Sequence, residues 1–413
     1  MMSSLFAGIT GLNANATAMR VIGDNIANVN TTAYKGNRAS FANILSTSLG
    51  GEASLKTVGR GVEFWDAATQ WTQGSLENTS SPTDLAINGK GFFMVEDAAG
   101  SSFYTRAGQF HFDKNGYLVN PDSLRLQGYA IDADGNLGSL TDVFIPGERI
   151  SPPAQTETMT FDINLNANAD ENQTFTASQS VYDSLGNAIP LTLTFTRTAT
   201  AGTWTVTGAV PDTLGSGVTF GAANAGSMTV SFDADGVMTA PLADVPVSIA
   251  LTNGATTPMT VNWDFIDDDN LSFGDLTGYA SESVATFQYQ DGYPPGTLRS
   301  ISVGEDGTVT AAYSNGELTP LFQIALVDFP SYDGLTKMGR NLYAESLESG
   351  QSLPGTAGSG RLGTISPNSL EMSNVDLAEE FVKMITTQRA FQANSRVITS
   401  SDEILQELIN IKR

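Results

Sequence analysis

The stretch that decides the fold is Leu5-Phe6-Ala7-Gly8-Ile9-Thr10-Gly11-Leu12, which opens an apolar stripe near the start of the chain. The stripe recurs every three or four residues, at Leu5, Ile9, Leu12, Ala16, Met19, Gly23 and Ile26. A second stripe closes the chain, at Leu377, Phe381, Met384, Gln388, Phe391, Ser395, Ile398, Asp402, Leu405 and Ile409. This alternation is typical of a helix that packs along another helix. The two ends therefore predict terminal helices over about 3–27 and 375–411.

Glycines interrupt the first predicted helix at Gly8, Gly11 and Gly23. Each glycine weakens an isolated helix by about 1 kcal/mol relative to alanine, so this helix is marginal alone in water. We expect the glycines to admit the close approach of another helix. The second helix opens with Ser373-Asn374-Val375-Asp376, which predicts a capping box led by Ser373.

Between the ends, the chain is predicted to form strands and turns. Residues 37–72 contain only short apolar runs and a Gly50-Gly51 break, and we expect them to be irregular. Farther on, Asn88-Gly89 separates two apolar runs, 84–87 and 91–95, which predicts a β-hairpin. Thr-rich alternation over 191–195 and 204–207 predicts half-exposed strands.

A short motif of an apolar residue, Asp, any residue, Asn or Asp, and Gly occurs several times. The copies begin at Phe112, Ile131 and Phe232, and a partial copy spans 305–309. A calcium loop of the EF-hand type would need a third oxygen ligand before the glycine and a later bidentate glutamate, and both are missing. Asn-Gly and Asp-Gly also supply the positive φ of two-residue hairpin turns, which is the interpretation we favour.

Charge divides the chain unevenly. The net charge is −24, and residues 150–298 hold sixteen acidic residues against one basic residue, Arg197. Such a surface disfavours nucleic acid and anionic membranes as partners. The acidic segment is flanked by strands of different character, so it predicts a domain inserted into another domain and exposed to solvent.

Candidate sites for chemistry are weak. His111 is the only histidine and there is no cysteine, so a transition-metal site, thiol chemistry and a serine triad all lack support. Residues 358–363 match G-x-G-x-x-G, but the flanking prolines do not predict the strand and helix that a dinucleotide site requires. Asp267-Asp268-Asp269 is read as a solvated loop. We expect no cofactor, no metal and no catalytic activity.

Export signals and membrane spans are not evident in the sequence. No apolar run approaches the roughly 18 to 20 residues that a membrane span needs. The first residues lack the basic start and apolar core of a cleaved secretion signal. We therefore expect no membrane insertion, and a dedicated export machine if the protein acts outside the cell.

The sequence predicts a mixed, mainly β fold whose terminal helices form a coiled-coil-like pair, with two nested, discontinuous β-domains. We expect four parts. The terminal helices are 1–27 plus 373–413, and a connecting segment is 28–72 plus 361–372. The first β-domain is 73–148 plus 291–360, and the inserted acidic β-domain is 149–290.

Both ends of the chain resemble the terminal signatures of bacterial flagellar rod and hook proteins. In residues 25–35 the similarity is carried by Asn25, Asn28, Asn30, Thr32, Tyr34 and Lys35. In residues 373–394 it is carried by Ser373, Asn374, Val375, Gln388, Arg389 and Asn394. Residues 84–95 and 105–118 are also similar to this family. The family commonly has glycine where this chain has Ala33, so the local turn geometry is of interest.

Rod members of this family are much shorter, so the length and the acidic insertion favour the hook type. The resemblance implies a curved, hollow helical tube that acts as a universal joint between rod and filament. It implies a large homopolymer outside the cell, with rod, hook-cap and hook–filament junction proteins and the flagellar type III export apparatus as partners. A distal rod protein is the first alternative, and a secreted β-rich enzyme acting on polysaccharide through residues 267–269 is the second.

Physical reasoning agrees with an open polymer, because contacts between two different surfaces that do not close into a ring give helical filaments. Ordering a 25-residue helix costs on the order of 25 to 50 kcal/mol of backbone entropy. A free subunit does not offer partners on both sides, so we expect the ends to order on assembly. We also expect that deleting residues 150–290 leaves tubes that form but bend wrongly.

Overall fold

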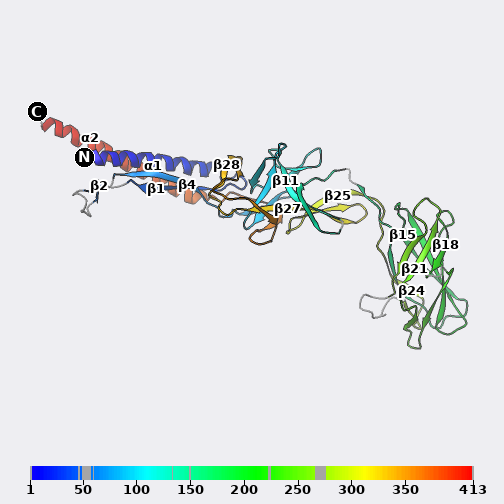
Figure 1. The fold of residues 1–413 in the computed structure, drawn as a ribbon. Helices are drawn as coiled ribbons and strands as arrows, with labels where there is room; N and C mark the ends of the chain where they lie inside the picture. The colour runs from blue at the N-terminus through cyan, green and yellow to red at the C-terminus, as the bar shows by residue number, and fades with distance from the viewer. Residues whose placement is uncertain are drawn as a thin grey trace. The chain divides into compact units, whose positions relative to one another are not determined.

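The computed structural model describes residues 2–44, 47–48, 57–58, 60–132, 134–147, 150–221, 225–265 and 276–411. The described part is mainly β, with helix α1 (Met2–Ala27) first and helix α2 (Leu377–Ile411) last. The two helices lie side by side (Figure 1). The predicted fold class is therefore confirmed. The chain forms two compact units. Unit 1 is Met1–Gly147, Ile301–Ala311 and Thr319–Arg413, and unit 2 is Glu148–Ser300 and Ala312–Leu318.

The ends of the helices are set by side chains that satisfy free backbone groups. Asp376 caps α2, because its Oδ1 accepts the N–H groups of Ala378 at 2.8 Å and Glu379 at 3.2 Å. The predicted capping box led by Ser373 is wrong, since its Oγ accepts the N–H of Val375 one turn earlier. At the other helix, Asn28 Nδ2 donates to the carbonyl of Asp24, at 2.9 Å, just past the last residue of α1.

A two-stranded ribbon packs along α1. Strands β1 (Asn37–Asn43) and β4 (Val62–Thr69) pair antiparallel and both contact the helix. The Oγ1 of Thr10 on α1 accepts the N–H of Val62, at 3.3 Å. The expected irregularity of 37–72 is wrong for these strands. Strand β1 is rich in Asn, Ala and Ser, which are weak strand formers, and it is supported by pairing with β4 and by contact with α1. A second pair joins β2 (Thr47–Ser48) and β3 (Thr57–Val58), while Gly50-Gly51 lies outside the described residues.

The main sheet of unit 1 runs in the order β26-β27-β11-β7-β8-β29-β28. Its strands along this path are β7 (Phe92–Glu96), β8 (Ser102–Thr105), β11 (Arg125–Ile131), β26 (Thr308–Tyr313), β27 (Leu318–Asp328), β28 (Thr336–Gly339) and β29 (Leu342–Ala344). Strands off this path are β9 (His111–Phe112), β10 (Leu118–Val119), β12 (Leu137–Asp142) and β30 (Leu353–Thr356). His111 lies in a strand, as expected, and is exposed.

Two short strand pairs join the first β segments to the segment before α2. Strand β5 (Leu76–Asn78) pairs with β32 (Ser369–Glu371), and β6 (Leu85–Asn88) pairs with β31 (Thr364–Pro367). The hairpin predicted at Asn88-Gly89 is wrong, because β6 pairs with β31 and β7 pairs with β8. The carbonyls of Ile87, Gly89 and Gly91 instead accept hydrogen bonds from the guanidinium of Arg106. Residues 87–91 therefore surround the guanidinium of Arg106 instead of forming a hairpin.

Unit 1 has an aromatic core. Its buried members are Phe92, Tyr104, Val327, Phe329, Leu335 and Tyr343, with Trp71, Met94 and Tyr332 packed against them. The rings meet mainly edge to face: Tyr104 and Phe329 lie 4.8 Å apart between centroids, and Phe92 and Tyr332 lie 5.3 Å apart. This core lies on the main sheet of unit 1, because Phe92, Tyr104, Val327 and Tyr343 belong to its strands.

Unit 2 contains two sheets that share one core. One has the order β18-β21-β22-β14-β23, with β24 also paired to β14. Its strands are β14 (Thr158–Asn164), β18 (Gly215–Phe220), β21 (Val245–Leu251), β22 (Met259–Trp263), β23 (Leu276–Thr277) and β24 (Val284–Gln290). The other runs β15-β16-β17-β19-β20, with β15 (Thr174–Tyr182), β16 (Ala188–Arg197), β17 (Thr203–Ala209), β19 (Met228–Phe232) and β20 (Met238–Ala240).

The core of unit 2 is built from alternating strand residues. Along β16, Leu191, Leu193 and Phe195 are buried while the threonines between them are half-exposed, so the predicted alternation is confirmed. Both tryptophans of the unit, Trp204 and Trp263, are fully buried in the shared core. The apolar side chains of the two sheets thus fill one interior.

The repeated Asp motifs close hairpins, as predicted. In the copy after Phe112, Asp113 Oδ1 accepts the N–H groups of Asn115 and Tyr117, each at 2.8 Å. Only the glycine, Gly116, has a positive φ, +95°. The loops therefore hold three residues and end in a left-handed glycine, rather than two residues as expected. Asp183 makes the same kind of turn, since its Oδ1 accepts the N–H groups of Leu185 and Asn187, although Leu185 departs from the sequence motif.

The chain passes into and out of unit 2 through adjacent strands. Strand β13 (Ile150–Ser151) pairs antiparallel with β25 (Gly296–Val303), placing Ile150 opposite Thr297 and Ser151 opposite Gly296. Among the residues that the structure describes, neither helix is long and apolar enough to cross a membrane.

Candidate functional site

Small residues form the face of α1 that meets α2. The buried positions of α1 are Gly8, Gly11, Ala14, Ala18, Ile22 and Asn25. A Cβ atom at Gly8 would lie 3.1 Å from Ile398 Cγ1, and one at Gly11 would lie 2.8 Å from Asn394 Nδ2. Gly8 and Gly11 therefore admit the second helix closely, as the sequence predicts, whereas a Cβ at Gly23 would meet nothing within 4 Å, so the prediction is wrong there. The helices run antiparallel, because Gly8 lies beside Ile398 while Asn25 reaches Glu380.

The inner face of α2 alternates polar and apolar residues with heptad spacing. Met384, Phe391, Ile398 and Leu405 recur every seven residues and are half-buried. Between them, every seven residues, lie Glu380, Thr387, Asn394 and Ser401. The four apolar residues of this seam belong to the second predicted stripe. The four polar residues were not predicted, because they carry no hydrophobic signal.

The remaining predicted interface residues lie beside the seam. On α1, Leu5, Leu12, Ala16, Met19, Gly23 and Ile26 are half-buried, and Ile9 is exposed. On α2, Leu377 and Phe381 are exposed, while Ile409 belongs to the helix without a described side-chain environment. For most of α1, each residue of the predicted stripe lies one position after a residue of the buried face. The predicted stripe is therefore rotated about 100° around the helix axis from the face that meets α2. It is only partly covered within one chain.

Several large apolar side chains of the helix pair face solvent. They are Phe6 and Ile9 on α1, and Leu377, Phe381, Val382, Ile385, Val397 and Ile404 on α2. Phe6 and Val382 are the most exposed, at 59% and 60%. Five of these residues were not predicted: Phe6, Val382, Ile385, Val397 and Ile404. They flank the seam by one or two positions, and a search for a second stripe beside the first could have found them.

Asn25 organises the turn that follows α1. Its Nδ2 donates to the carbonyl of Asn37 at 2.8 Å and to Glu380 Oε2 at 3.3 Å. Its Oδ1 accepts the N–H of Asn37 at 2.9 Å. One buried side chain thereby joins the end of α1, the start of β1 and the first turn of α2.

Other signature residues fasten the same turn. Tyr34 donates its hydroxyl hydrogen to Asp24 Oδ2 at 3.0 Å, and burial together with the Asp24 carboxylate raises the pKa of Tyr34. Thr31 Oγ1 donates to Asn28 Oδ1, at 3.1 Å. From the other end of the chain, Asn374 Oδ1 accepts the N–H of Gly36 at 2.8 Å. These contacts explain the Asn and Thr content of the signatures as local geometry.

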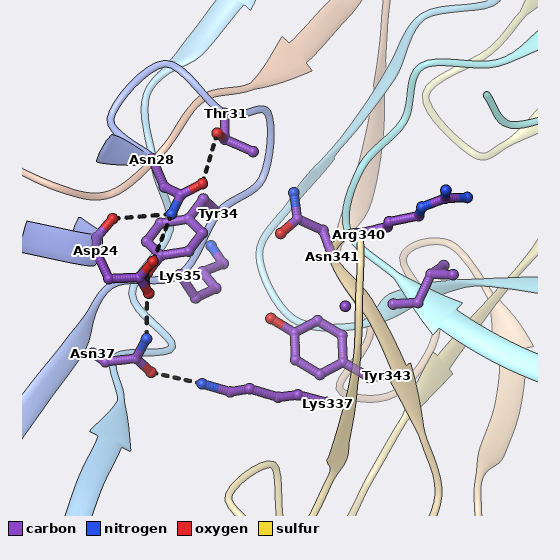
Figure 2. A pocket seen from close by; sticks show the side chains of 12 residues that line it. Asp24, Asn28, Thr31, Tyr34, Lys35, Asn37, Lys337, Arg340, Asn341 and Tyr343 are labelled. Atoms are coloured by element: carbon purple, nitrogen blue, oxygen red, sulfur yellow. Dashed lines mark hydrogen bonds between the residues drawn. The ribbon is translucent and has the colours of Figure 1, made fainter. Parts of the chain in front are cut away.

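A pocket of about 300 Å³ lies beside this turn (Figure 2). Asp24, Tyr34 and Asn37 line one side, and Lys337 reaches across to place Nζ 2.6 Å from Asn37 Oδ1. On the far side, Asn341 Nδ2 donates to the carbonyl of Thr32, at 2.8 Å. The β28–β29 hairpin is thus tied to the turn after α1, 300 residues earlier in the chain.

A buried charge cluster joins both signature segments to the β-body. The Glu371 carboxylate pairs with Lys35 Nζ through Oε1 and with Arg106 Nε through Oε2, the latter at 2.8 Å. All three side chains are at most 6% exposed. Glu371 Oε1 also accepts the N–H of Gly74. Burial lowers the pKa of Lys35; the carboxylate of Glu371 opposes this shift, and the charge of Arg106 adds to it.

The signature residues that remain have no structural partner of this kind. Asn30, Gln388 and Arg389 are exposed, and in the described part of the chain none of them makes a hydrogen bond or an ion pair through its side chain. Ser373 and Val375 lie in the extended segment before α2, and a Cβ at Gly36 would lie 3.1 Å from Val375 Cγ2. Sequence reasoning missed Glu371 and Arg106, which lie 265 residues apart and share no local pattern.

The structure does not support the other candidate sites. The G-x-G-x-x-G match at 358–363 lies in the turn between β30 and β31, without a following helix. The aspartates 267–269, on which the polysaccharide-enzyme alternative rested, lie outside the described residues.

Four family models from one group of proteins match segments of the chain. Family models described as Flagella basal body rod protein and Flagellar basal body rod FlgEFG protein C-terminal match residues 5–35 and 366–411. Flagellar hook protein FlgE/F/G D1 domain matches residues 86–171, and Flagellar basal body protein FlaE D2 domain matches residues 154–293. The matches cover both terminal helices and both β regions.

Relatives and a solved structure agree with these matches. The chain is 33% identical to the flagellar hook protein FlgE of Borreliella burgdorferi and 35% identical to that of Treponema pallidum, each over the full length of both chains. It is 35% identical to the Escherichia coli FlgE, covering 98% of each chain. A crystal structure of the Helicobacter pylori flagellar hook protein FlgE2 gives a TM-score of 0.51 at 16% identity, over 72% of this chain and 100% of that one, which shows a common fold.

These relatives are hook proteins along their whole length, so the distal rod alternative is not favoured. The chain belongs to the flagellar hook protein family.

Proposed function

We propose that this chain is the structural subunit of a bacterial flagellar hook, polymerising into a curved, hollow helical tube that transmits torque from rod to filament. The observation that carries the proposal is the exposed apolar surface of the helix pair. In a single chain, Phe6, Phe381 and Val382 are half or more exposed although the helices are already packed on each other. On α2, Leu377, Phe381, Val382 and Ile385 are neighbours on the helix surface, and isolated soluble proteins rarely leave a contiguous apolar patch of this kind uncovered.

Covering this surface supplies part of the free energy of assembly. Burying the remainder of a half-exposed Phe, Ile or Val is worth about 1 kcal/mol. The eight exposed side chains of the pair together offer on the order of 8 kcal/mol per copy, before the cost of association. That cost is itself on the order of 4 to 15 kcal/mol, so further contacts between copies must add to this surface. Assembly is therefore expected where subunits are concentrated.

Ordering of the helices is coupled to assembly in this proposal. Each helix has one packed side within the chain and one apolar side left for neighbours. Gly8, Gly11 and Gly23 keep α1 marginal without those neighbours. Subunits in dilute solution therefore polymerise little, and the terminal helices gain protection when a neighbour covers them. Hydrogen exchange in monomer and polymer measures this gain directly.

The proposed partners follow from hook membership. Copies of the same chain are the main partner, and rod proteins, the hook cap, the hook–filament junction proteins and the flagellar type III export apparatus are the others. The polymer lies outside the cell, and its subunits leave through the export apparatus. The family match and the exposed faces of the helices support self-association, and the family match supports attachment to the basal body.

We also propose the four-part organisation given by the sequence. The helices, 1–27 plus 373–413, form the inner tube, and the connecting segment is 28–72 plus 361–372. The β-domain of 73–148 plus 291–360 surrounds them, and 149–290 forms the outer, acidic surface. The outer domain makes small wet contacts that rearrange during bending, while the helices hold.

The test is polymerisation of the purified full-length chain. We expect curved tubes in electron micrographs once the concentration exceeds a threshold. The variant Val397→Ser/Ile404→Ser removes exposed apolar surface from α2 and should raise that threshold at least tenfold. The control Leu242→Ser makes the same kind of change on unit 2, where Leu242 is exposed, and should leave the threshold unchanged. A chain that stays monomeric at every concentration, or a double variant that assembles like the parent, contradicts the proposal.

A further inference from the structure

Trp65 occupies an unusual position in the β1–β4 ribbon. Ser40 pairs with Asp66 and Phe41 pairs with Phe64, so Trp65 is the extra residue of a β-bulge. Trp65 is 72% exposed and continues the alternation of β4, in which Glu63 is exposed and Val62 and Phe64 are half-buried.

The other tryptophans of the chain are covered. Trp204 and Trp263 are fully buried in unit 2. Trp71 packs against the aromatic core of unit 1 and donates its Nε1–H to Asp333 Oδ1 at 3.0 Å. Trp65 therefore has the exposure expected of a docking residue, because tryptophan is enriched among the residues that dominate binding energy at interfaces.

Two exposed acidic residues, Glu63 and Asp66, flank Trp65 on β4. Phe41 on the neighbouring strand is 46% exposed and packs edge to face on Phe64, with centroids 6.3 Å apart, rather than on Trp65. Trp65 is thus an exposed aromatic side chain with a negative rim.

The start of α2 carries the complementary pattern. Phe381, Ile385 and Arg389 are spaced four residues apart and form one row on the helix surface. Phe381 and Ile385 are exposed, with Val382 beside them. Arg389 is exposed and makes no side-chain hydrogen bond or ion pair in the described part of the chain. The row thus presents an apolar surface that ends in a free cation.

We propose that the β1–β4 ribbon docks, through Trp65, on the Phe381–Ile385–Arg389 row of a second copy of this chain. Trp65 covers the apolar part of the row, and Arg389 meets the acidic rim at Glu63. Each copy carries both surfaces, and the surfaces differ, so the contact repeats from copy to copy without closing. The inference rests on the proposed polymerisation and names one of its contacts.

The first experiment removes the anchor. Trp65→Ala should raise the polymerisation threshold of the full-length chain at least tenfold, because truncating a central interface tryptophan typically has such an effect. Leu347→Ala is the control, since Leu347 is a fully exposed apolar residue of the same unit and should leave the threshold unchanged. Circular dichroism of the monomers should be the same for both variants and the parent.

The second experiment observes Trp65 directly. The difference in fluorescence between the parent and Trp65→Phe isolates the emission of Trp65. In the monomer this emission should be quenched by iodide, and in the polymer it should shift to shorter wavelength and lose most of its quenching. Polymers in which Trp65 is still quenched as in the monomer overturn the inference and leave the proposed function standing.

The third experiment identifies the partner surface. The chain has no cysteine, so two engineered cysteines report one contact without background. Glu63→Cys chains mixed with Arg389→Cys chains should form disulfide-linked dimers under oxidation, in the polymer and not in the monomer. Arg396→Cys, two turns farther along α2, replaces Arg389→Cys as the control and should not cross-link.

Charge reversal gives an independent check. Glu63→Arg and Arg389→Glu should each raise the threshold, and the double variant should recover most of the loss. Polymers without the 63–389 cross-link, or a double variant that is no better than either single one, overturn the assigned partner surface. Failure of the parent chain to polymerise is a different result, which contradicts the proposed function itself.

Discussion

The terminal helices and unit 2 bury their side chains in opposite ways. Unit 2 buries its largest side chains, including Trp204 and Trp263, between its own two sheets. The helices bring small residues such as Gly8, Gly11 and Ala18 to their shared seam and leave Phe6 and Phe381 in solvent. Unit 2 therefore covers these large apolar side chains without a neighbour. The helix pair leaves large apolar side chains exposed, where another chain can cover them.

Charge reinforces the contrast. Residues 150–298 carry sixteen acidic side chains and a single basic one, and copies of such a domain repel each other at low salt. Arg197, the single base, is buried and donates to the carbonyls of Thr200 and Thr203. It therefore serves the fold of the domain rather than its surface. Attraction between copies must come from elsewhere in the chain.

Removing unit 2 is the largest change that tests this contrast. Ile150 lies opposite Thr297 and Ser151 opposite Gly296, so the ends left by deleting residues 152–295 are adjacent and a short Gly-Ser linker can join them. We expect the shortened chain to form tubes with altered curvature, as judged by electron microscopy. Complete loss of tubes, with helical circular dichroism retained, would show that the helices alone do not hold the polymer.

Glu371→Gln tests the cluster that holds the helices to the β-body. The change leaves Lys35 and Arg106 as buried cations without a counter-charge, which should cost about 3 to 5 kcal/mol of the free energy of unfolding of unit 1. Denaturant unfolding followed separately for the two units measures it, and unit 2 should be unaffected. The control Glu379→Gln breaks a largely exposed pair with Lys383 and should cost less than about 1 kcal/mol. Equal costs for the two variants would refute the role of the cluster.

Alkaline pH should weaken unit 1 through its buried tyrosines. Burial raises the pKa of Tyr343 to about 12 from the ordinary value of 10.0. The neutral phenol is favoured in the folded state, so its contribution is complete below pH 10 and is lost as the pH rises toward 12. The loss amounts to about 3 kcal/mol.

The variant Tyr343→Phe isolates this contribution. The lowered pKa of Lys35 acts in the opposite direction, because deprotonation of Lys35 at high pH favours the fold, and it is common to both chains. The difference in free energy of unfolding between Tyr343→Phe and the parent should therefore shift in favour of the variant between pH 10 and 12. A difference that is constant over this range would contradict the assignment.

Local patterns in the sequence predicted the elements that depend on local physics. The three-and-four alternation placed both helices, the threonine alternation placed β16, and Asp113 with Gly116 placed a hairpin turn. In each case the residues that decide the structure are close together in the chain. Periodicity and turn chemistry act over such distances.

Long-range partners were not predictable from the same patterns. Asn88-Gly89 has the composition of a hairpin, but Arg106 and the distant strand β31 impose another pairing. On α1, the seam was predicted one residue away from its true position for most of its length. Glycine and alanine at positions such as 11 and 18 carry no hydrophobic signal although they decide where the helices touch.

The seam can be tested at two glycines of α1 with different surroundings. Gly11→Leu should push the helices apart and cost about 1 to 3 kcal/mol, because a Cβ there already lies 2.8 Å from Asn394. Gly23→Ala has nothing within 4 Å of the added carbon and should stabilise α1 by up to about 1 kcal/mol. Thermal unfolding followed by helical circular dichroism measures both. The same sign for both variants would contradict the close approach at Gly11.

Ala33 gives the smallest and most local test. Its φ of +58° lies in the left-handed region, and it is 1% exposed. Its N–H donates to the carbonyl of Glu371 at 2.7 Å, so the strained turn is held by the segment that leads to α2. Left-handed geometry costs an L-residue about 1 to 2 kcal/mol, which glycine avoids. Ala33→Gly, however, loses a buried methyl worth about 0.8 kcal/mol and adds flexibility to the unfolded chain.

These contributions nearly cancel, so Ala33→Gly should change the free energy of unfolding of unit 1 by less than about 1 kcal/mol. Ala18→Gly is the matched control, because Ala18 is equally buried but lies inside α1. There the lost methyl and the lower helix propensity of glycine add up to about 2 kcal/mol. If the two substitutions cost the same, the backbone at Ala33 stores no strain. A large difference would mean that this chain, with alanine where its family commonly has glycine, accepts a strained turn to keep the segment after α1 attached to the segment before α2.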